Sequence, residues 1–436
     1  MSFESLLLED LGAPVKNAIV GGPFGSNLVS KDYVDVGVPV IRGQNMGKKW
    51  VGGEFVFVSN EKAEQLSQNK ARPGDLVFTQ RGTLGQVAII PAKPFAEYIV
   101  SQSQMKVTLN PEKADVGFMY YLFGSEEQLR HIRNSSIQTG VPHTNLGILR
   151  KTPVKIPPLK IQQEIASILG SLDDRIALLR ETNTTLEAIA QALFKSWFVD
   201  FDPVRAKQEG REPEGMDAYT AALFPNSFEE SELGLVPKGW VVKSLAELMD
   251  IAGGTQPPAN EFIDLPRDGY IRLIQIRDYE TDSHITYIPD THKLRKATKT
   301  DIMIARYGAS VGRICWGLEG AYNVALVKVV CEENSREYLR TYLKSDVFQS
   351  RLDAVSGRSA QAGFNKGDIA SFKFVVPPDY NLALYQDIVW TLRSSVVARL
   401  DRIRAIATLR DTLLPRLISG QLRLPDAETL IEETAA

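Results

Sequence analysis

The chain carries the same series of short motifs twice. A Gly-Gly turn lies early in each half, at 21–25 and at 253–257, and each is followed by an apolar strand that ends in polar residues, at 38–45 and at 270–278. A series repeated in order along a chain is typical of a duplicated architecture. A single glycine match is ordinary turn chemistry, but several matches in one order are not. We therefore predict two tandem units of one fold.

Two further pairs of motifs complete the series. The stretch 74–82, GDLVFTQRG, matches 300–308, TDIMIARYG, and both run through another glycine into a short apolar strand. Each unit then ends on an apolar strand closed by Pro-Pro, at 154–158 and at 374–378. Strand and turn signals dominate both units. Each is predicted to be a β-rich domain of the mixed α/β class.

A long helical pattern follows each Pro-Pro. Apolar residues fall at three- and four-residue steps from Ile161 to Trp197 and again from Tyr385 to Leu413. A seam of this length, with prolines ahead of it to stop the strand, indicates a coiled coil. Each helix would span roughly 35–40 residues, or about 55 Å at 1.5 Å per residue. A helix that long needs a partner, and we expect the two helices to pair with each other as an antiparallel coiled coil.

The charges of the two helical segments are opposite. Residues 161–199 carry five acidic and three basic side chains, a net charge of −2, whereas residues 385–419 carry six basic and three acidic, a net charge of +3. Opposite charges favour pairing between the helices over self-pairing. The alternative is that these charges are simply solvated faces, because exposed ion pairs contribute only ~0–1 kcal/mol each.

Between the first helix and the second repeat, the sequence is rich in Pro, Gly and Glu, which is typical of a partly irregular linker. The last residues are acidic and are expected to fray. The predicted organisation is a first globular unit at 1–157, a helix at 158–200, a linker at 201–235, a second globular unit at 236–378, a helix at 379–421 and a frayed acidic tail at 422–436.

Composition limits the function classes. The 436 residues, 44% hydrophobic and 24% charged, suit a soluble protein of two or three domains, and no apolar run approaches the roughly 20 residues that span a bilayer. The N-terminus lacks the order of a signal peptide, and two cysteines fit a reduced cytoplasm. Four scattered histidines and two cysteines offer no metal-ligand spacing. A net charge of −3 argues against a broad basic surface but leaves local DNA-binding clusters open.

Three local stretches, set in this order of units and helices, resemble the specificity subunits of type I restriction–modification systems. They are PPLKIQQEIASILGSLD at 157–173, FPNSFEESELGLVPKGW at 224–240 and LLPRLISGQL at 413–422. The resemblance covers almost the whole chain. One departure is Asp379–Leu382 after the second Pro-Pro, where the first copy has Leu159–Gln162.

The resemblance implies a division of labour. Each recognition unit would read one half of a split, asymmetric DNA target, and the helix pair would set the gap and dock two methyltransferase subunits. Two restriction subunits, which translocate and cut DNA, would complete the complex. S-adenosylmethionine, ATP and Mg are then expected in those partner subunits and none in this chain. The complex would act in the cytoplasm of a bacterium or archaeon.

The candidates for DNA contact are polar residues at predicted strand ends and loops. Arginine can pair with guanine, glutamine and asparagine with adenine, and lysine with phosphate. Any one of them could instead be a solvated surface residue, so the clusters are a better prediction than their members. The predicted residues are Arg42, Gln44, Asn45, Lys48, Lys49, Gln80, Arg81 and His143 in the first unit, and Gln275, Arg277, Arg306, Tyr307, Arg313, Arg358, Gln361, Asn365 and Lys366 in the second.

The motifs of catalysis are incomplete. Val376-Pro377-Pro378-Asp379-Tyr380 lacks the leading Asp or Asn of an adenine methyltransferase loop, and the glycines at 43–49 miss the spacing and the Ser/Thr of a phosphate loop. No Ser/His/Asp grouping can be picked out. We therefore expect a non-catalytic chain. The alternatives are a stand-alone DNA modification enzyme or nuclease with duplicated recognition domains, and a structural adaptor with no DNA role.

Overall fold

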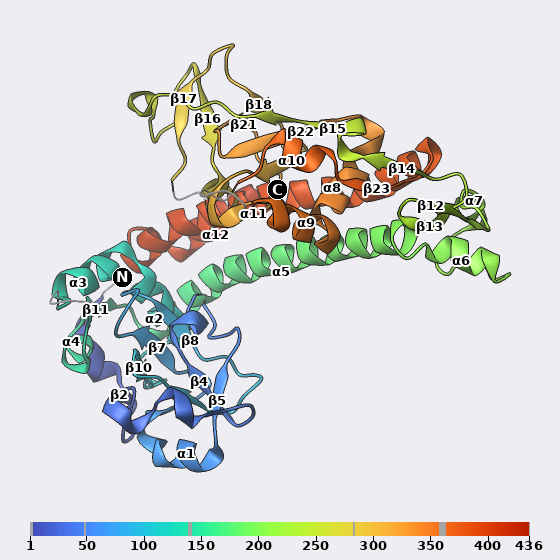
Figure 1. Ribbon diagram of the computed structural model, residues 1–436. Helices are drawn as coiled ribbons and strands as arrows, with labels where there is room; N and C mark the ends of the chain where they lie inside the picture. The colour runs from blue at the N-terminus through green and yellow to red at the C-terminus, as the bar shows by residue number, and fades with distance from the viewer. Residues whose placement is uncertain (1–2, 48, 138–141, 282–283, 357–362, 436) are drawn as a thin grey trace. The chain divides into compact units, whose positions relative to one another are not determined.

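The computed structural model describes residues 3–47, 49–137, 142–281, 284–356 and 363–435 (Figure 1). The chain divides into two compact units. Unit 1 comprises Met1–Ala177 together with Arg404–Ala436, and unit 2 comprises Leu178–Ile403. Unit 1 is therefore assembled from two segments that are far apart in the sequence.

Unit 1 is built on two principal sheets and a short strand pair. One sheet has the order β2-β10-β7-β8 and is antiparallel; the other has the order β3-β5-β4-β9-β6, in which β4 and β9 run parallel. Strands β1 and β11 pair separately. The strands are β1 (Glu4–Leu7), β2 (Ile19–Gly21), β3 (Tyr33–Val34), β4 (Val38–Ile41), β5 (Val56–Val58), β6 (Lys70–Ala71), β7 (Leu76–Thr79), β8 (Val87–Ile89), β9 (Tyr98–Val100), β10 (Gln104–Val107) and β11 (Pro153–Ile156).

Strand β7 is buried on both faces, which explains its continuous run of apolar residues. Leu76 and Phe78 point into the larger core of unit 1, and Val77 points into a smaller core that contains Ala88 and Ile41. Helix α2 packs beside β8 and closes the larger core (Figure 1). The helices of this unit outside the long pair are α1 (Asn60–Gln65), α2 (Val116–Gly124), α3 (Glu126–Ser135), α4 (Leu146–Arg150) and α12 (Leu424–Ala435).

Unit 2 repeats the topology of unit 1. Its antiparallel sheet has the order β15-β22-β19-β20, and its second sheet has the order β17-β16-β21-β18, in which β16 and β21 run parallel as β4 and β9 do. This match confirms the tandem duplication of a β-rich domain. The elements are β14 (Val241–Ser244), β15 (Met249–Gly253), β16 (Tyr270–Ile274), β17 (Tyr287–Pro289), β18 (Lys296–Ala297), β19 (Met303–Ala305), β20 (Ile314–Cys315), β21 (Gly320–Tyr322), β22 (Leu326–Cys331), β23 (Lys373–Val376), α8 (Arg336–Lys344), α9 (Asp346–Ser356) and α10 (Lys366–Ala370).

The duplicated Gly-Gly turns have a steric cause. The second glycine of each, Gly22 and Gly254, lies against the backbone of the turn that precedes β10 or β22. A Cβ atom at Gly22 would be 1.9 Å from the carbonyl oxygen of Ser101, and one at Gly254 would be 2.1 Å from that of Asn323. Both values are far inside van der Waals contact, so only glycine fits. The sequence predicted these positions as turns, and the structure adds that they are close backbone crossings.

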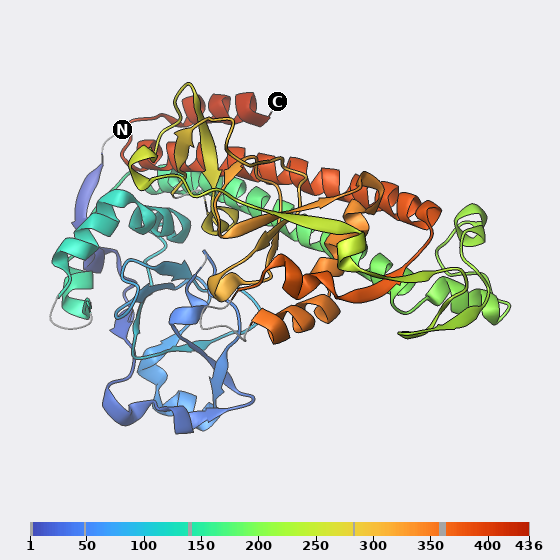
Figure 2. The ribbon, with the colours of Figure 1, turned by 45° about the horizontal axis from the view of Figure 1, so that its top comes forward.

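The two long helices, α5 (Leu159–Phe198) and α11 (Asp379–Ile418), each contribute to both units. In unit 1, Arg410 of α11 donates a hydrogen bond of 2.7 Å to Asp173 of α5. In unit 2, the Tyr385 hydroxyl of α11 donates a hydrogen bond of 3.1 Å to the carbonyl of Ala190 in α5. The start of one helix thus lies beside the end of the other (Figure 2). This confirms the antiparallel pair, and seam residues such as Leu172, Ile176, Val389 and Val396 are buried.

The linker and the tail are more regular than expected. Residues 201–235 contain two short helices, α6 (Asp202–Gln208) and α7 (Ala218–Ala222), and most of the hairpin of β12 (Phe228–Ser231) and β13 (Gly234–Pro237). The tail, expected to fray, forms helix α12, and its Leu424 and Ala427 are buried in the core of unit 1. None of the helices in the described ranges is long and apolar enough to cross a membrane.

Candidate nucleic-acid interface

In unit 1, the ends of several strands meet at one edge. The Ser101 amide donates to the carbonyl of Ile41 at 3.0 Å, which ties the β9–β10 turn to the end of β4. The Gln80 amide donates to the carbonyl of Ser103 at 2.7 Å, and the Gln80 carbonyl accepts from Thr144 at 3.0 Å. We call this edge the unit 1 strand-end surface, defined as residues 22–25, 42–44, 80–82, 101–103 and 142–144.

Unit 2 builds the same edge with two equivalent backbone bonds. The Asn323 amide donates to the carbonyl of Ile274 at 3.2 Å, and the Arg306 amide donates to that of Ala325 at 2.8 Å. The guanidinium of Arg306 also donates to the carbonyl of Phe364 at 3.0 Å, which holds the segment before α10 in place. The unit 2 strand-end surface is defined as residues 254–256, 275–277, 306–308, 323–325 and 363–365.

Equivalent positions of the two strand-end surfaces carry different side chains. In unit 1, Arg81 forms an isolated backbone β-bridge with His143. At the equivalent position of unit 2, Tyr307 forms such a β-bridge with Gly363. One residue earlier, Gln80 stands where unit 2 has Arg306, whose guanidinium carbon lies 5.1 Å from the centre of the Tyr307 ring. The scaffold is therefore constant, and its donors and acceptors vary.

The chain also matches one known protein family twice, once in each repeat. The matched segments are residues 28–188 and 237–399, and the family is described as the type I restriction modification DNA specificity domain. The chain belongs to this family. The two matches fall on the two repeats that the sequence and the topology show.

Two relatives of the chain match it over most of their length. It is 26% identical to the HindI specificity subunit of Haemophilus influenzae, over 84% of this chain and 90% of that protein. It is 22% identical to the MjaIX specificity subunit of Methanocaldococcus jannaschii, over 94% and 92%. The crystal structure of a type I S subunit from M. genitalium has the same fold, with a TM-score of 0.56 and 15% identity over 96% of each chain. As a member of the specificity family, the chain is a non-catalytic recognition component.

Ten of the predicted DNA-contact residues lie on the strand-end surfaces. One of them, Asn365, caps α10, and the other nine differ in exposure. Arg81 and Gln44 are exposed in unit 1, as are Tyr307 and Arg277 in unit 2, and the others are half-buried. The nine residues are Arg42, Gln44, Gln80, Arg81 and His143 in unit 1, and Gln275, Arg277, Arg306 and Tyr307 in unit 2. Lys48, Arg358 and Gln361 lie outside the described residues.

The two predicted asparagines, Asn45 and Asn365, use their side chains to hold neighbouring backbone groups in place. Asn45 is 2% exposed, and its amide group donates to the carbonyls of Gly52 and Glu54 at 2.9 Å each while accepting from the Arg42 amide at 3.0 Å. Asn365 caps α10 by accepting a hydrogen bond of 2.8 Å from the Gly367 amide. Both side chains are thus used within the protein, and Asn365 remains exposed at the edge of the unit 2 surface.

Three predicted basic residues are engaged with other side chains. Arg313 forms an ion pair with Glu280, and Lys366 forms one with Asp250 at 2.7 Å. The Lys366 hydrogen bond lowers the pKa of the Asp250 carboxyl below its usual value. Lys49 donates a hydrogen bond of 3.2 Å to the hydroxyl of Tyr121. These bonds reduce the freedom of the three cations to meet DNA phosphates.

The sequence reading missed the β9–β10 turn. Gln102 is exposed in this turn, and its side chain donates to the carbonyl of Leu28 at 3.2 Å and to that of Gly25. Phe24, in the loop that Gln102 holds, has 79% of its surface exposed. The sequence signal for this turn is the polar run from Ser101 to Gln104 between two apolar strands.

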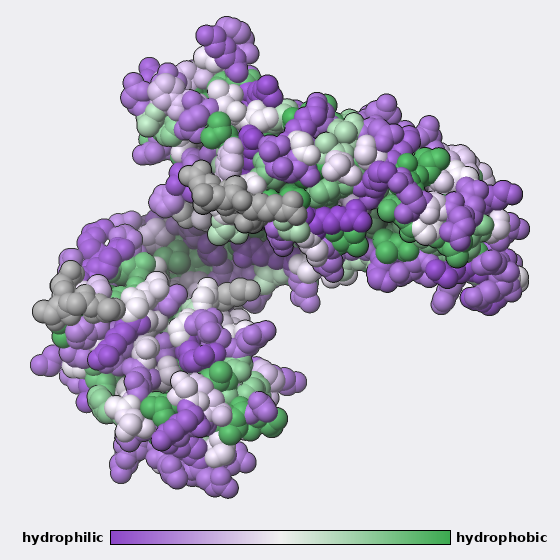
Figure 3. Space-filling view, in the orientation of Figure 1, coloured by the Kyte–Doolittle hydropathy of each residue, from purple (hydrophilic) through white to green (hydrophobic). Residues whose placement is uncertain are grey.

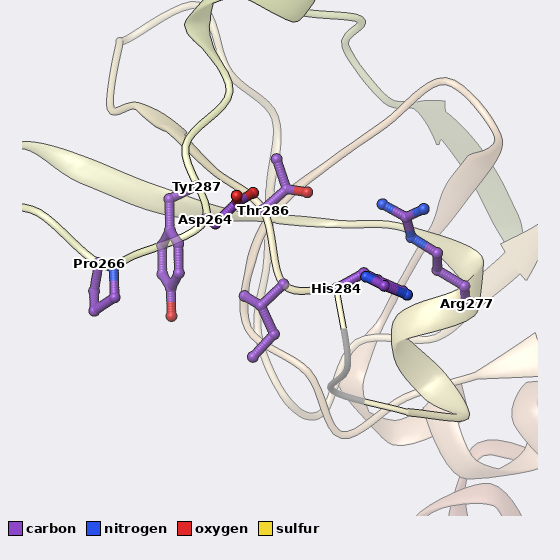
Figure 4. A pocket seen from close by; sticks show the side chains of 7 residues that line it. Asp264, Pro266, Arg277, His284, Thr286 and Tyr287 are labelled. Carbon is purple, nitrogen blue, oxygen red and sulfur yellow. The ribbon is translucent and has the colours of Figure 1, made fainter. Parts of the chain in front are cut away.

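A polar pocket lies next to the unit 2 strand-end surface. Figure 4 shows Arg277 and His284 on one side of it and Pro266 and Tyr287 on the other, with Asp264 and Thr286 between. The visible surface of each unit is largely hydrophilic, with hydrophobic side chains in scattered groups (Figure 3). Among the described residues, no group of three His, Cys, Asp or Glu side chains could hold a metal ion.

Proposed function

We propose that the chain reads a split DNA target, with unit 1 on one half-site and unit 2 on the other, inside a type I restriction–modification complex. One observation carries the proposal: the two strand-end surfaces share a backbone frame and differ in their side chains. The pairs are Gln44 against Arg277, Gln80 against Arg306 and Arg81 against Tyr307. Two copies of one frame with different donors and acceptors suit two different base sequences.

The residue types suggest how each surface divides its work. Gln44 and Gln80 offer the amide pattern that matches adenine, and Arg81 and Arg277 offer the fork that matches guanine or grips phosphate. The exposed Phe24 and Tyr307 supply apolar contact to base methyl groups or sugars. In a net acidic chain, such local clusters would carry the recognition while partner subunits supply much of the phosphate contact.

The helix pair is the proposed dock for two methyltransferase subunits. Its helices expose large apolar side chains, among them Leu178 (57%) and Ile189 (49%) on α5, which a docked subunit would cover. Two restriction subunits would join the same assembly. In this arrangement S-adenosylmethionine, ATP and Mg serve the partner subunits, and the complex works on DNA in the cytoplasm of a bacterium or archaeon.

Methylome sequencing of cells that carry the complete system tests the proposal. We expect methylated adenines in an interrupted sequence with two fixed half-sites. Arg81→Ala should relax the base preference of one half-site and Arg306→Ala that of the other, each by about 1–3 kcal/mol if the side chain pairs with a base. A change of preference in both halves from either substitution would refute the assignment of one half-site to each unit.

A further inference from the structure

Lys49 is linked through Tyr121 to both long helices of unit 1. Its ammonium group donates to the Tyr121 hydroxyl at 3.2 Å, and that hydroxyl donates to the carboxylate of Asp173 on α5 at 2.6 Å. The other oxygen of Asp173 accepts a hydrogen bond of 2.7 Å from Arg410 on α11. Tyr121 is 3% exposed, and its burial beside Asp173 raises the pKa of its hydroxyl, so the hydroxyl remains protonated. A loop, α2, α5 and α11 are thus joined in series.

A glycine of α5 faces this lysine. Gly170 is buried and lies inside the helix, where glycine is less favourable than alanine. A Cβ atom there would lie 3.4 Å from the Lys49 ammonium nitrogen, and it has no other close neighbour among the described residues. The ammonium also lies 5.2 Å from the centre of the Tyr121 ring. The helix surface, the aromatic ring and the hydroxyl together form a seat for one cation.

Hydrogen bonds on both sides of Lys49 tie its neighbours to the rest of unit 1. Asn45 bonds across it to Gly52 and Glu54, and the side-chain amide of Gln44 donates to the carbonyl of Glu54 at 3.1 Å. Beyond Lys49, the Val51 amide donates to the carbonyl of Ile89 at 2.9 Å, which ties the loop to β8. A displacement of Lys49 would therefore be passed to Gln44 and the unit 1 strand-end surface.

We propose that Lys49 is a positioning residue, which fixes the unit 1 strand-end surface against α5 through Tyr121 and Asp173, and that it is not a DNA phosphate contact. The inference rests on the proposed function, since it assumes that this surface reads DNA. It gives Lys49 a role that its charge alone would not indicate. The helices that are proposed to dock the methyltransferase subunits would then also fix the orientation of the unit 1 strand-end surface.

The salt dependence of DNA binding separates the two roles of Lys49. The full chain is assembled with its methyltransferase subunits, and binding to a random-sequence duplex is measured from about 50 to 200 mM salt. The plot of log K against log salt has a negative slope, and loss of one phosphate contact makes that slope less steep by about one. For Lys49→Met we expect an unchanged slope. A slope reduced by about one would overturn the proposal.

Half-site discrimination provides the second readout. Duplexes in which one or the other half-site is scrambled are compared with the intact target. We expect Lys49→Met and Tyr121→Phe each to lower discrimination at the first half-site about 5- to 10-fold, the loss typical of one hydrogen bond, and to leave the second unchanged. Unchanged discrimination at the first half-site, or equal losses at both, would overturn the proposal. If the wild-type complex does not discriminate at either half-site, the proposed function itself fails.

Substitutions at Gly170 control for folding. Gly170→Ala adds helix propensity and only a marginal contact, so discrimination should be retained. Gly170→Leu places its side chain where the Lys49 ammonium lies and should reproduce the Lys49→Met loss at the first half-site. Thermal melting of each complex identifies any variant that fails to fold. A folded Gly170→Leu complex with wild-type discrimination would contradict the proposed role of the contact between Lys49, α5 and Tyr121.

Discussion

The Nε atom of Arg393 on α11 lies 3.1 Å from a carboxylate oxygen of Glu337 on α8, and neither side chain is more than 3% exposed. Glu337 also pairs with Arg340 at 3.2 Å, while Glu187 of α5 pairs with Lys344 and with Arg393. These five residues are called the buried ion cluster, and its three cations lie 4.6–5.3 Å from the centre of the Trp316 ring. The cluster holds three cations and two carboxylates, and it joins a helix of the second recognition domain to both long helices.

The excess of cations predicts an order of mutational effects. Glu337→Gln leaves three cations with one carboxylate, and we expect it to lower the free energy of unfolding by about 3–5 kcal/mol. Arg393→Met leaves two cations with two carboxylates and should cost clearly less. Urea unfolding of the two variants tests this, and a larger loss for Arg393→Met would contradict the charge argument.

Lys344 predicts a pH dependence. Burial and the nearby Arg340 lower the pKa of Lys344 to about 8, against an ordinary value of 10.5. Between these values the unfolded chain binds a proton that the folded chain has released, so stability should rise with pH in this window. We expect about 1–2 kcal/mol more stability at pH 9.5 than at pH 7.5 from this group. Lys344→Met should flatten that part of the profile; an identical rise in the variant would assign it to other groups.

The duplicated glycines predict local damage. Gly22→Ala and Gly254→Ala each drive a methyl group into a backbone carbonyl, and we expect each to lower stability by about 1–3 kcal/mol or more. In DNA binding, each should impair only the half-site of its own unit. Gly47→Ala is the matched control, because nothing lies within 4 Å of its added methyl group. Damage from Gly47→Ala as large as from Gly22→Ala would remove the steric explanation.

The helix pair predicts a change of target spacing. Both α5 and α11 run from one unit into the other, so the insertion must be matched: four residues near Thr184 and four after Ala398. Each insertion adds about 6 Å and a little over one turn, which keeps the seam almost in phase. Methylome sequencing should then find the same half-sites with a gap longer by about two base pairs. An unchanged gap would exclude the helices as the spacer. Insertion into α5 alone should separate Asp173 from Arg410 or Glu187 from Arg393 and impair assembly.

The sequence predicted best what depends on local pattern. The helical seam from Ile161 to Trp197 lies in one continuous helix, and the repeated motifs lie in equivalent strands and turns. The side-chain partners in loops could not be read in this way. Asn45 looked like a base-reading amide, but its partners, Gly52 and Glu54, are selected by the path of the loop.

Long-range packing explains the other departures. The tail was predicted to fray because it is acidic, yet its Leu424, Ala427 and Leu430 share one side of a helix and pack on the core of unit 1. Lys49 resembled a phosphate contact because its partner, Tyr121, lies 72 residues away. In each case the decisive contact comes from a distant part of the chain, which residue type and local spacing do not reveal.

The split composition of unit 1 has a consequence for synthesis on the ribosome. Chains emerge from the N-terminus, and domains generally fold as they become complete. Unit 2 is one continuous segment, so it has all its residues once position 403 has emerged. Unit 1 begins earlier but must wait for residues 404–436, whose Leu413, Leu417 and Leu424 fill its core. The first recognition domain to be translated is therefore the last to be finished, and until then its apolar surface is open to chaperones and proteases.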